Sequence, residues 1–171
     1  MNKEVNVMAS QKHLDLLSSG KTLWNKWRQE YADVQALETD LHEADLHGAD
    51  LHGVDFYGVD LTEANLQGAD LREADLREAD LRNADLRNAN LSDANLVKAH
   101  LRWADLRSAR LCRSNLKQAD LSKADLRGAD LDGAILIKAI FDEALLSRVD
   151  LSEADLDKFD RREAERTEVR A

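Results

Sequence analysis

Three histidines at five-residue intervals are the side chains in this sequence best suited to metal chemistry. His42, His47 and His52 each offer an imidazole nitrogen, which is a common ligand of zinc. A shared site requires the three rings to converge on one point, so it depends on how the backbone bends between them. His13 and His100 stand alone in the sequence.

A second group that could react is the single cysteine, Cys112. Arg110 and Arg113 lie beside it, and nearby positive charge can lower the pKa of a thiol. The sequence has no glycine-rich phosphate loop and no nucleophile–histidine spacing typical of hydrolases. We therefore predict no catalytic residues, no cofactor and no metal ion, and we interpret Cys112 as an inert surface thiol. A lone thiol cannot form an internal disulfide and suits a reducing compartment.

The overall charge and hydropathy narrow the classes of partner. The formal net charge of the 171-residue chain is −10, and charged residues of both signs make up 34% of it. Binding to nucleic acid generally needs a basic excess that displaces phosphate counterions. No apolar run approaches the roughly 20 residues of a membrane-spanning helix, and residues 1–11 lack the features of a secretory signal. We predict a cytoplasmic protein without a membrane or nucleic-acid partner.

A five-residue repeat must position all of these side chains. From Leu41 to Leu156 a large apolar residue occurs at every fifth position, 24 times in all, as 22 Leu plus Phe56 and Phe141. A small residue, mostly Ala, lies two positions before each of them, and Asp or Asn usually stands between the two. The repeat therefore reads Ala-Asp/Asn-Leu-X-X.

A period of five fits neither regular element. On an α-helix, at about 100° per residue, each repeat would rotate its leucine by about 140° and scatter the leucines around the axis. On a flat strand, an odd repeat sends successive leucines to opposite faces. The large apolar residues share one interior only if the chain turns in every repeat.

The residues around each leucine are suited to such a turn. Six of the seven glycines lie two positions after the leucine, and Asn83, Asn88 and Asp93 take the same place in other repeats. These residue types tolerate the backbone conformations of tight corners. The Asp or Asn before the leucine can accept hydrogen bonds from nearby backbone N–H groups. The pattern predicts short extended segments and corners wound into a coil, with Leu and Ala inside.

Runs such as Ala69-Asp70-Leu71-Arg72-Glu73, and the similar run over residues 124–128, make the chain similar to the pentapeptide-repeat proteins. The resemblance covers residues 39–160. It implies an all-β solenoid, a right-handed quadrilateral β-helix with four repeats in each coil and about six coils. The five-residue period alone does not reveal the four sides.

A helical cap is predicted before the repeats, over residues 1–38. Ser10 can cap a helix that runs through Leu17 and ends near Gly20, and a second helix is expected over residues 22–34. The run from Trp24 to Arg28 resembles the helical leader of cyanobacterial pentapeptide-repeat proteins. Six side chains are expected to form one apolar lid over the first coil: Leu14, Leu17, Leu23, Trp24, Trp27 and Tyr31.

Four repeats in each coil would place side chains 20 residues apart above one another. The histidines at 42, 47 and 52 would then lie on three successive sides, so we expect no shared metal site and interpret all five histidines as solvated. Arg87, Arg107 and Arg127 would form a ladder on one side, which could bind phosphate. Pairing with the aspartates of the same side, at 85, 105 and 125, is the interpretation we favour.

The charge also varies along the coil. Residues 39–70 hold eight acidic residues and no Lys or Arg, whereas residues 91–128 hold eight basic and four acidic residues. Some pentapeptide-repeat proteins of the quinolone-resistance type are thought to mimic duplex DNA, which requires a nearly continuous acidic surface. The basic belt interrupts such a surface here. Charge mimicry that inhibits a DNA-binding enzyme such as a topoisomerase is therefore the alternative function.

The strongest departure from the motif is an apolar group near the end of the repeats. Ile135, Ile140 and Leu145 replace the usual Asp, Ile137 adds another outward apolar side chain, and Val97 should lie on the same side as Ile137. An exposed apolar group is an interaction site or is covered, here by the charged tail over residues 161–171. We predict a non-catalytic structural or protein-interaction module, with an unidentified protein partner or self-association through its C-terminal end.

Overall fold

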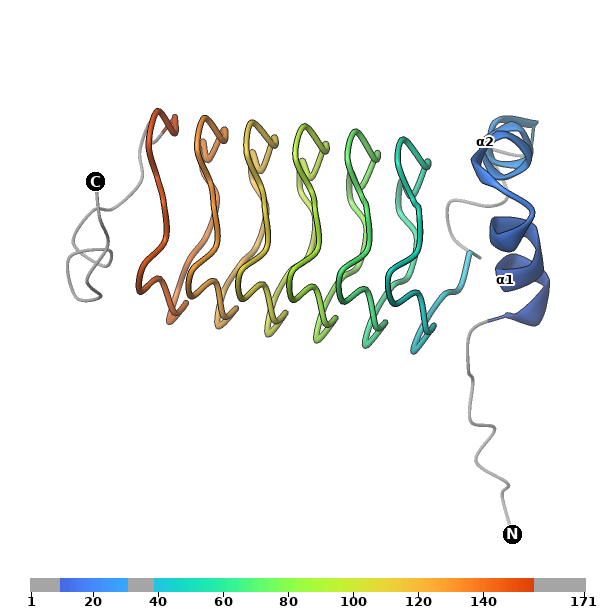
Figure 1. Cartoon of the computed structure of the whole chain (residues 1–171), viewed down its shortest axis with the longest axis horizontal. Coiled ribbons are helices and arrows are strands. Elements are labelled where there is room, and N and C mark those ends of the chain that lie inside the picture. Colours follow the sequence, from blue (N-terminus) through green and yellow to red (C-terminus); the bar gives the residue numbers. More distant parts are fainter. Residues whose placement is uncertain (1–9, 31–38, 156–171) are drawn as a thin grey trace, which may run out of the picture.

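Two short helices precede a coil of five-residue segments (Figure 1). The computed structural model describes residues 10–30 and 39–155. Helix α1 spans Gln11–Ser18 and helix α2 spans Lys21–Glu30. Three predicted features lie outside the described residues: the continuation of the second helix to residue 34, Tyr31 in the lid, and the tail over residues 161–171.

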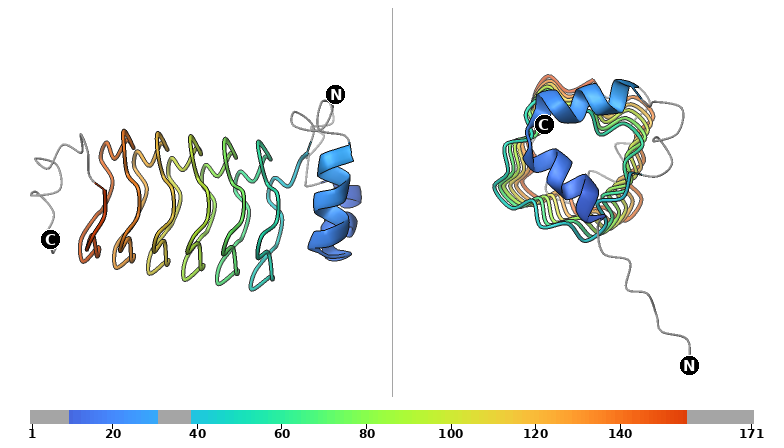
Figure 2. Two further views of the ribbon diagram at one scale, coloured as in Figure 1. Left: turned by 90° about the horizontal axis from the view of Figure 1, so that it is seen from above. Right: turned by 90° about the vertical axis from the view of Figure 1, so that its right-hand side faces the viewer.

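The repeats pair through single-residue parallel bridges. Within residues 39–155, no β-strand is longer than one such bridge. The residue before each leucine bridges the residue 20 positions later, from Asp40↔Asp60 to Ile135↔Asp155. Backbone bonds follow the same register, as in the donation from Leu81 N–H to the His100 carbonyl at 2.8 Å. Twenty residues per coil correspond to four repeats, and the coils superimpose as a four-sided tube when seen along the axis (Figure 2).

Each described repeat turns at the second residue after its leucine. The backbone there has a positive φ in every described repeat, at glycines such as Gly68 (φ 67°) and at other residues such as Glu73 (φ 56°). This left-handed conformation costs little for glycine and more for other residues. The Oδ1 atom of Asp70 accepts the backbone N–H of Arg72 at 3.2 Å, so the predicted hydrogen-bonding role of Asp is confirmed.

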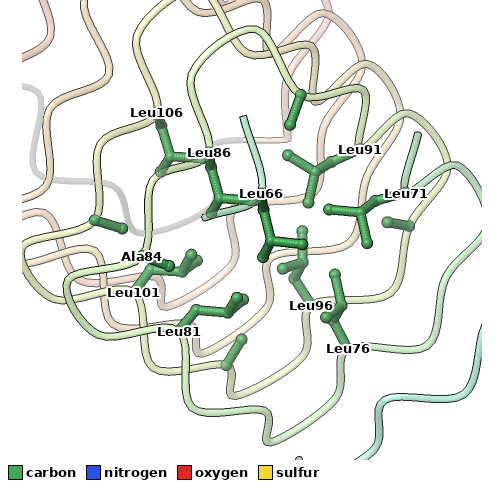
Figure 3. Packing of buried hydrophobic residues seen from close by; sticks show 14 of the residues in the cluster. Leu66, Leu71, Leu76, Leu81, Ala84, Leu86, Leu91, Leu96, Leu101 and Leu106 are labelled. Atoms are coloured by element: carbon green, nitrogen blue, oxygen red, sulfur yellow. The ribbon is translucent and has the colours of Figure 1, made fainter. Parts of the chain in front are cut away.

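The interior consists of leucine columns that run along the axis. Leu66, Leu86 and Leu106 lie one behind another in successive coils (Figure 3), and each is fully buried. Alanines such as Ala84 lie beside these columns and are also buried. A fully buried leucine contributes roughly 1.5–3 kcal/mol, so the stacked columns hold the coil together.

Helices α1 and α2 lie across the N-terminal end of the tube (Figure 2). The Trp24 side chain is fully buried, and its Nε1–H donates to the Asp55 carbonyl at 2.7 Å. Arg28 is only 5% exposed and donates through Nη1 to Thr39 Oγ1 at 2.9 Å and through Nη2 to the carbonyl of Tyr57. Desolvation lowers the pKa of Arg28, while the negative charge of Asp55 opposes this effect.

Two details of the predicted cap are wrong. Leu23 is 53% exposed and not part of the lid, because one helical residue corresponds to a rotation of about 100°, and α2 turns Trp24 and Arg28 toward the coil instead. Ser10 occupies the N-cap position of α1, but its side chain makes no capping hydrogen bond. Leu17 is buried and Leu14 and Trp27 are partly buried against the core, as expected.

Candidate functional site

The histidines at 42, 47 and 52 lie on three successive sides of the first coil, because each belongs to a different repeat of the register. His47 and His100 are exposed, as expected. His13 is not simply solvated: its Nδ1 lies 3.3 Å from the backbone of Asp40, and its ring centroid lies 5.4 Å from that of Trp27. His42 is also half-buried and contacted by other side chains.

His42 is close to two carboxylates that sequence reasoning did not connect with it. Its Nε2 atom lies 3.4 Å from Glu43 Oε1. A carboxylate oxygen of Glu63 completes the group, and the three possible ligand atoms lie within 4.8 Å of one another. The signal was present in the sequence, since Glu43 and Glu63 are 20 residues apart and therefore stack in neighbouring coils.

The arginine ladder is paired with aspartates, as predicted. Arg107 donates through Nε to Asp105 Oδ1 at 2.8 Å and through Nη2 to Asp105 Oδ2 at 2.5 Å. The same Nε lies 3.6 Å from Asp125 in the next coil. Hydrogen bonds from Arg127 lower the pKa of Asp125. These pairs are partly exposed and each contributes little to stability, but they occupy the guanidinium edges that a phosphate would use.

The structure spreads the predicted apolar group over three sides of the coil. Ile135 and Ile137 belong to one repeat, and Val97 lies in the column of Ile137, separated from it by Lys117 in the intervening coil. Ile140 and Leu145 begin the next two sides. Ile137 and Ile140 flank a single corner, at Lys138. The closest apolar surface is therefore an edge, formed by residues 135, 137 and 140.

Two members of the group are strongly exposed. Ile140 is 51% exposed and Leu145 is 46% exposed. In the preceding coils the columns of these two residues hold polar side chains. The column of Ile140 holds Asp60, Asp80, His100 and Asp120, and the column of Leu145 holds Asn65, Asp85, Asp105 and Asp125. Within these two columns, exposed apolar side chains therefore occur only in the last described coil.

Cys112 lies in a setting that disfavours the thiolate. Its Sγ donates to Asp130 Oδ2 at 2.9 Å. Burial and the carboxylate of Asp130 raise the pKa of Cys112, and the positive charge of Arg110 only partly offsets them. Arg110 does act to lower this pKa, as the sequence suggested, but burial and Asp130 outweigh it. The sequence neighbours of Cys112 do not reveal that Asp130, in the next coil, accepts a hydrogen bond from the thiol.

We expect Cys112 to be alkylated more slowly than an unstructured cysteine at pH 8. A raised pKa reduces the thiolate fraction, and the thiolate is the reactive form. The rate should increase as pH rises through 9, and Asp130→Asn should increase the rate at pH 8, because the carboxylate no longer opposes ionisation. The measurement is the iodoacetamide reaction rate against pH, with the urea-unfolded chain as reference. Equal rates in the folded and unfolded chains would contradict the expectation.

Comparison with known proteins identifies the repeat. Residues 36–62, 55–93, 64–102, 94–133 and 124–160 match the pattern of pentapeptide repeats. No curated protein matches the chain. Among the described residues, no helix is long and apolar enough to cross a membrane.

Several solved structures are similar to this chain. The pentapeptide repeat protein Rfr23 from the cyanobacterium Cyanothece 51142 is 31% identical, with a TM-score of 0.61, over 76% of this chain and 95% of that chain. The pentapeptide repeat protein alr5209 from Nostoc Pcc 7120 is 40% identical, with a TM-score of 0.35, over 62% and 78%. Full-length QnrB1, a plasmid-mediated fluoroquinolone resistance protein, is 21% identical, with a TM-score of 0.36, over 77% and 81%. That likeness carries no argument about function.

The residues that match the repeat pattern are those that form the coil, with its 20-residue register and its buried leucine columns. This chain has two N-terminal helices before its right-handed quadrilateral β-helix and is similar to a cyanobacterial pentapeptide repeat protein. The chain is therefore a member of the pentapeptide-repeat family.

Proposed function

We propose that this protein is a non-catalytic protein-interaction module of the cytoplasm, which binds an apolar surface of a partner protein through the edge formed by Ile135, Ile137 and Ile140. The observation that carries the proposal is the 51% exposure of Ile140 in a column that holds polar side chains in the preceding coils. Isolated apolar residues are common on protein surfaces, but apolar groups that gather at one edge are typical of interaction sites.

The chemistry of the other described residues supports a binding role. The leucine and alanine side chains of the repeats are buried in the interior. The aspartates accept hydrogen bonds from the backbone of the turns or from arginines. Within residues 10–30 and 39–155, the thiol of Cys112 donates to a carboxylate and has no histidine partner. These placements leave surface contact as the activity that the coil can best perform, and the lone thiol suits a reducing compartment.

The experiment compares oligomeric mass and captured proteins for the wild type and two variants, Ile137→Asp and Ile140→Asp. Each variant places a charge at the apolar edge, which should abolish association because an unpaired carboxylate would have to be desolvated. His100→Asp is the matched control, since it introduces the same charge into the column of Ile140, at an exposed position outside the edge.

The expected result is a specific protein, captured by the wild type and by His100→Asp and lost from both edge variants. A doubled mass in light scattering that is lost only in the edge variants would identify a second copy of the chain as that protein. Identical masses and identical captured proteins for all four chains would overturn the proposal. Capture of topoisomerase subunits, lost when acidic residues 40–63 are neutralised, would overturn it in favour of charge mimicry.

A further inference from the structure

The second surface that suggests a ligand lies at the opposite end of the coil, around His42. Its Nε2 atom lies 3.4 Å from Glu43 Oε1, and one ring nitrogen of His42, one carboxylate oxygen of Glu43 and one of Glu63 all lie within 4.8 Å of one another. His42 and Glu43 occupy adjacent positions in the first coil, and Glu63 stacks on Glu43 from the next coil. The group is half-buried at the imidazole and open at the carboxylates.

Side chains outside the group determine which ring nitrogen of His42 carries the proton. Thr62 Oγ1 lies 2.5 Å from Asp60 Oδ1, and a carboxylate can only accept, so the hydroxyl proton of Thr62 points to Asp60. Thr62 Oγ1 also lies 2.7 Å from His42 Nδ1. Because the threonine proton is already used, Nδ1–H must be the donor in this second bond. The lone pair of a neutral His42 ring is therefore on Nε2, the atom that lies 3.4 Å from Glu43 Oε1.

This arrangement is the usual one for a metal-bound histidine. Ligating imidazoles donate their second ring N–H to an oxygen that orients the ring, and that partner is held by further hydrogen bonds. Here Thr62 is the orienting oxygen and Asp60 holds it. Asp60 is itself fixed, since its Oδ1 also accepts the backbone N–H of Thr62 at 2.9 Å.

The three ligand atoms are all acceptors when the ring is neutral, so a cation bound between them would be stabilised by all three. Some corner carboxylates elsewhere in the coil pair with a cation of the neighbouring coil, as Glu78 does with Lys98 at 3.1 Å and Asp93 with Arg113 at 2.7 Å. Among residues 10–30 and 39–155, neither Glu43 nor Glu63 has a lysine or arginine within salt-bridge distance, and residues 39–70 contain none.

We propose that His42, Glu43 and Glu63 bind a divalent transition-metal ion, with zinc as the best-matched ion. One imidazole nitrogen and two carboxylate oxygens are ligands that zinc accepts at about 2.0–2.2 Å. Tetrahedral bonds of that length require donors roughly 3.4 Å apart, which the His42–Glu43 distance already meets. The Glu63 side chain moves by a rotamer change to meet it, and water takes the fourth position. Calcium and magnesium prefer oxygen ligands alone.

The test is titration of the metal-free full chain with zinc chloride, followed by calorimetry. We expect one zinc ion per chain, with at least 10-fold weaker binding in His42→Ala and in Glu63→Gln. Thr62→Val keeps all three ligands but removes the orienting oxygen, and should weaken binding about 10–100-fold. His47→Ala is the matched control, because this exposed histidine lies in the next repeat and outside the group, and its affinity should equal that of the wild type.

Nitrogen NMR of the histidine ring separates ligation from a structural effect. The wild type should show the Nδ1–H tautomer of His42 without metal, and zinc should shift Nε2 alone. Thr62→Val should lose the tautomer preference while keeping its circular dichroism spectrum and melting temperature. The proposal is overturned if zinc does not bind, if His42→Ala binds it as tightly as the wild type, or if calcium displaces it at equal concentration.

Discussion

Leu86→Ala should reduce the free energy of unfolding by about 2–5 kcal/mol. Leu86 is fully buried between Leu66 and Leu106 in one column (Figure 3). The substitution removes apolar surface and leaves a cavity inside a narrow tube, where the backbone of each coil is bonded to the next coil on both sides. Such a frame cannot collapse easily around the missing atoms, so we expect a value in the upper half of the range. Equilibrium unfolding in urea, followed by circular dichroism, measures the change.

Leu145→Ala is the matched control, because it makes the same chemical change on the same side of the coil. Leu145 is 46% exposed, so its truncation removes little buried surface, and the free energy of unfolding should change by no more than about 0.5 kcal/mol. Similar losses at the two positions would show that the column does not dominate stability, and would count against the stacked interior.

The interior could be predicted from the sequence because a single physical argument determines it. Leucines five residues apart share an environment only when the chain turns in each repeat, and Leu66, Leu71 and Leu76 do so on successive sides (Figure 3). The number of sides did not follow from the period, since a five-residue turn is compatible with several coils. The bridges between residues 20 apart supply that number.

The surface was less predictable, because its contacts depend on which residues meet across coils. Asp130 raises the pKa of Cys112 from a neighbouring coil, and Glu63 reaches the group of His42 in the same way. Both contacts are visible once residues are compared at a spacing close to 20. The exposure of Leu23 and the burial of Arg28 were missed for a different reason. Assigning the helix face from apolar residues alone places an arginine at the surface, but the long side chain of Arg28 is buried while its guanidinium donates to the hydroxyl of Thr39 and the carbonyl of Tyr57.

Trp24→Ala should reduce the free energy of unfolding by about 3–5 kcal/mol. The indole is fully buried at the end of the tube, donates to the Asp55 carbonyl at 2.7 Å, and packs edge-on against Phe56 with ring centroids 5.7 Å apart. Truncation opens a large cavity and leaves that carbonyl without the indole donor. The loss should be concentrated in the first coil, so amide exchange at Phe56 should accelerate more than at Leu106.

Leu23→Ala separates the anchoring of the cap from the helix itself. Leu23 is adjacent to Trp24 in α2 but 53% exposed, so its replacement by a good helix former should change the free energy of unfolding by no more than about 0.5 kcal/mol. A solenoid end is an open sheet edge unless something covers it. If Trp24→Ala unfolds like Leu23→Ala, the helices do not protect that edge, and the first coil must be stabilised by its own leucines. If it loses several kcal/mol, the cap is part of the cooperative unit, and the tryptophan of the leader determines where that unit begins.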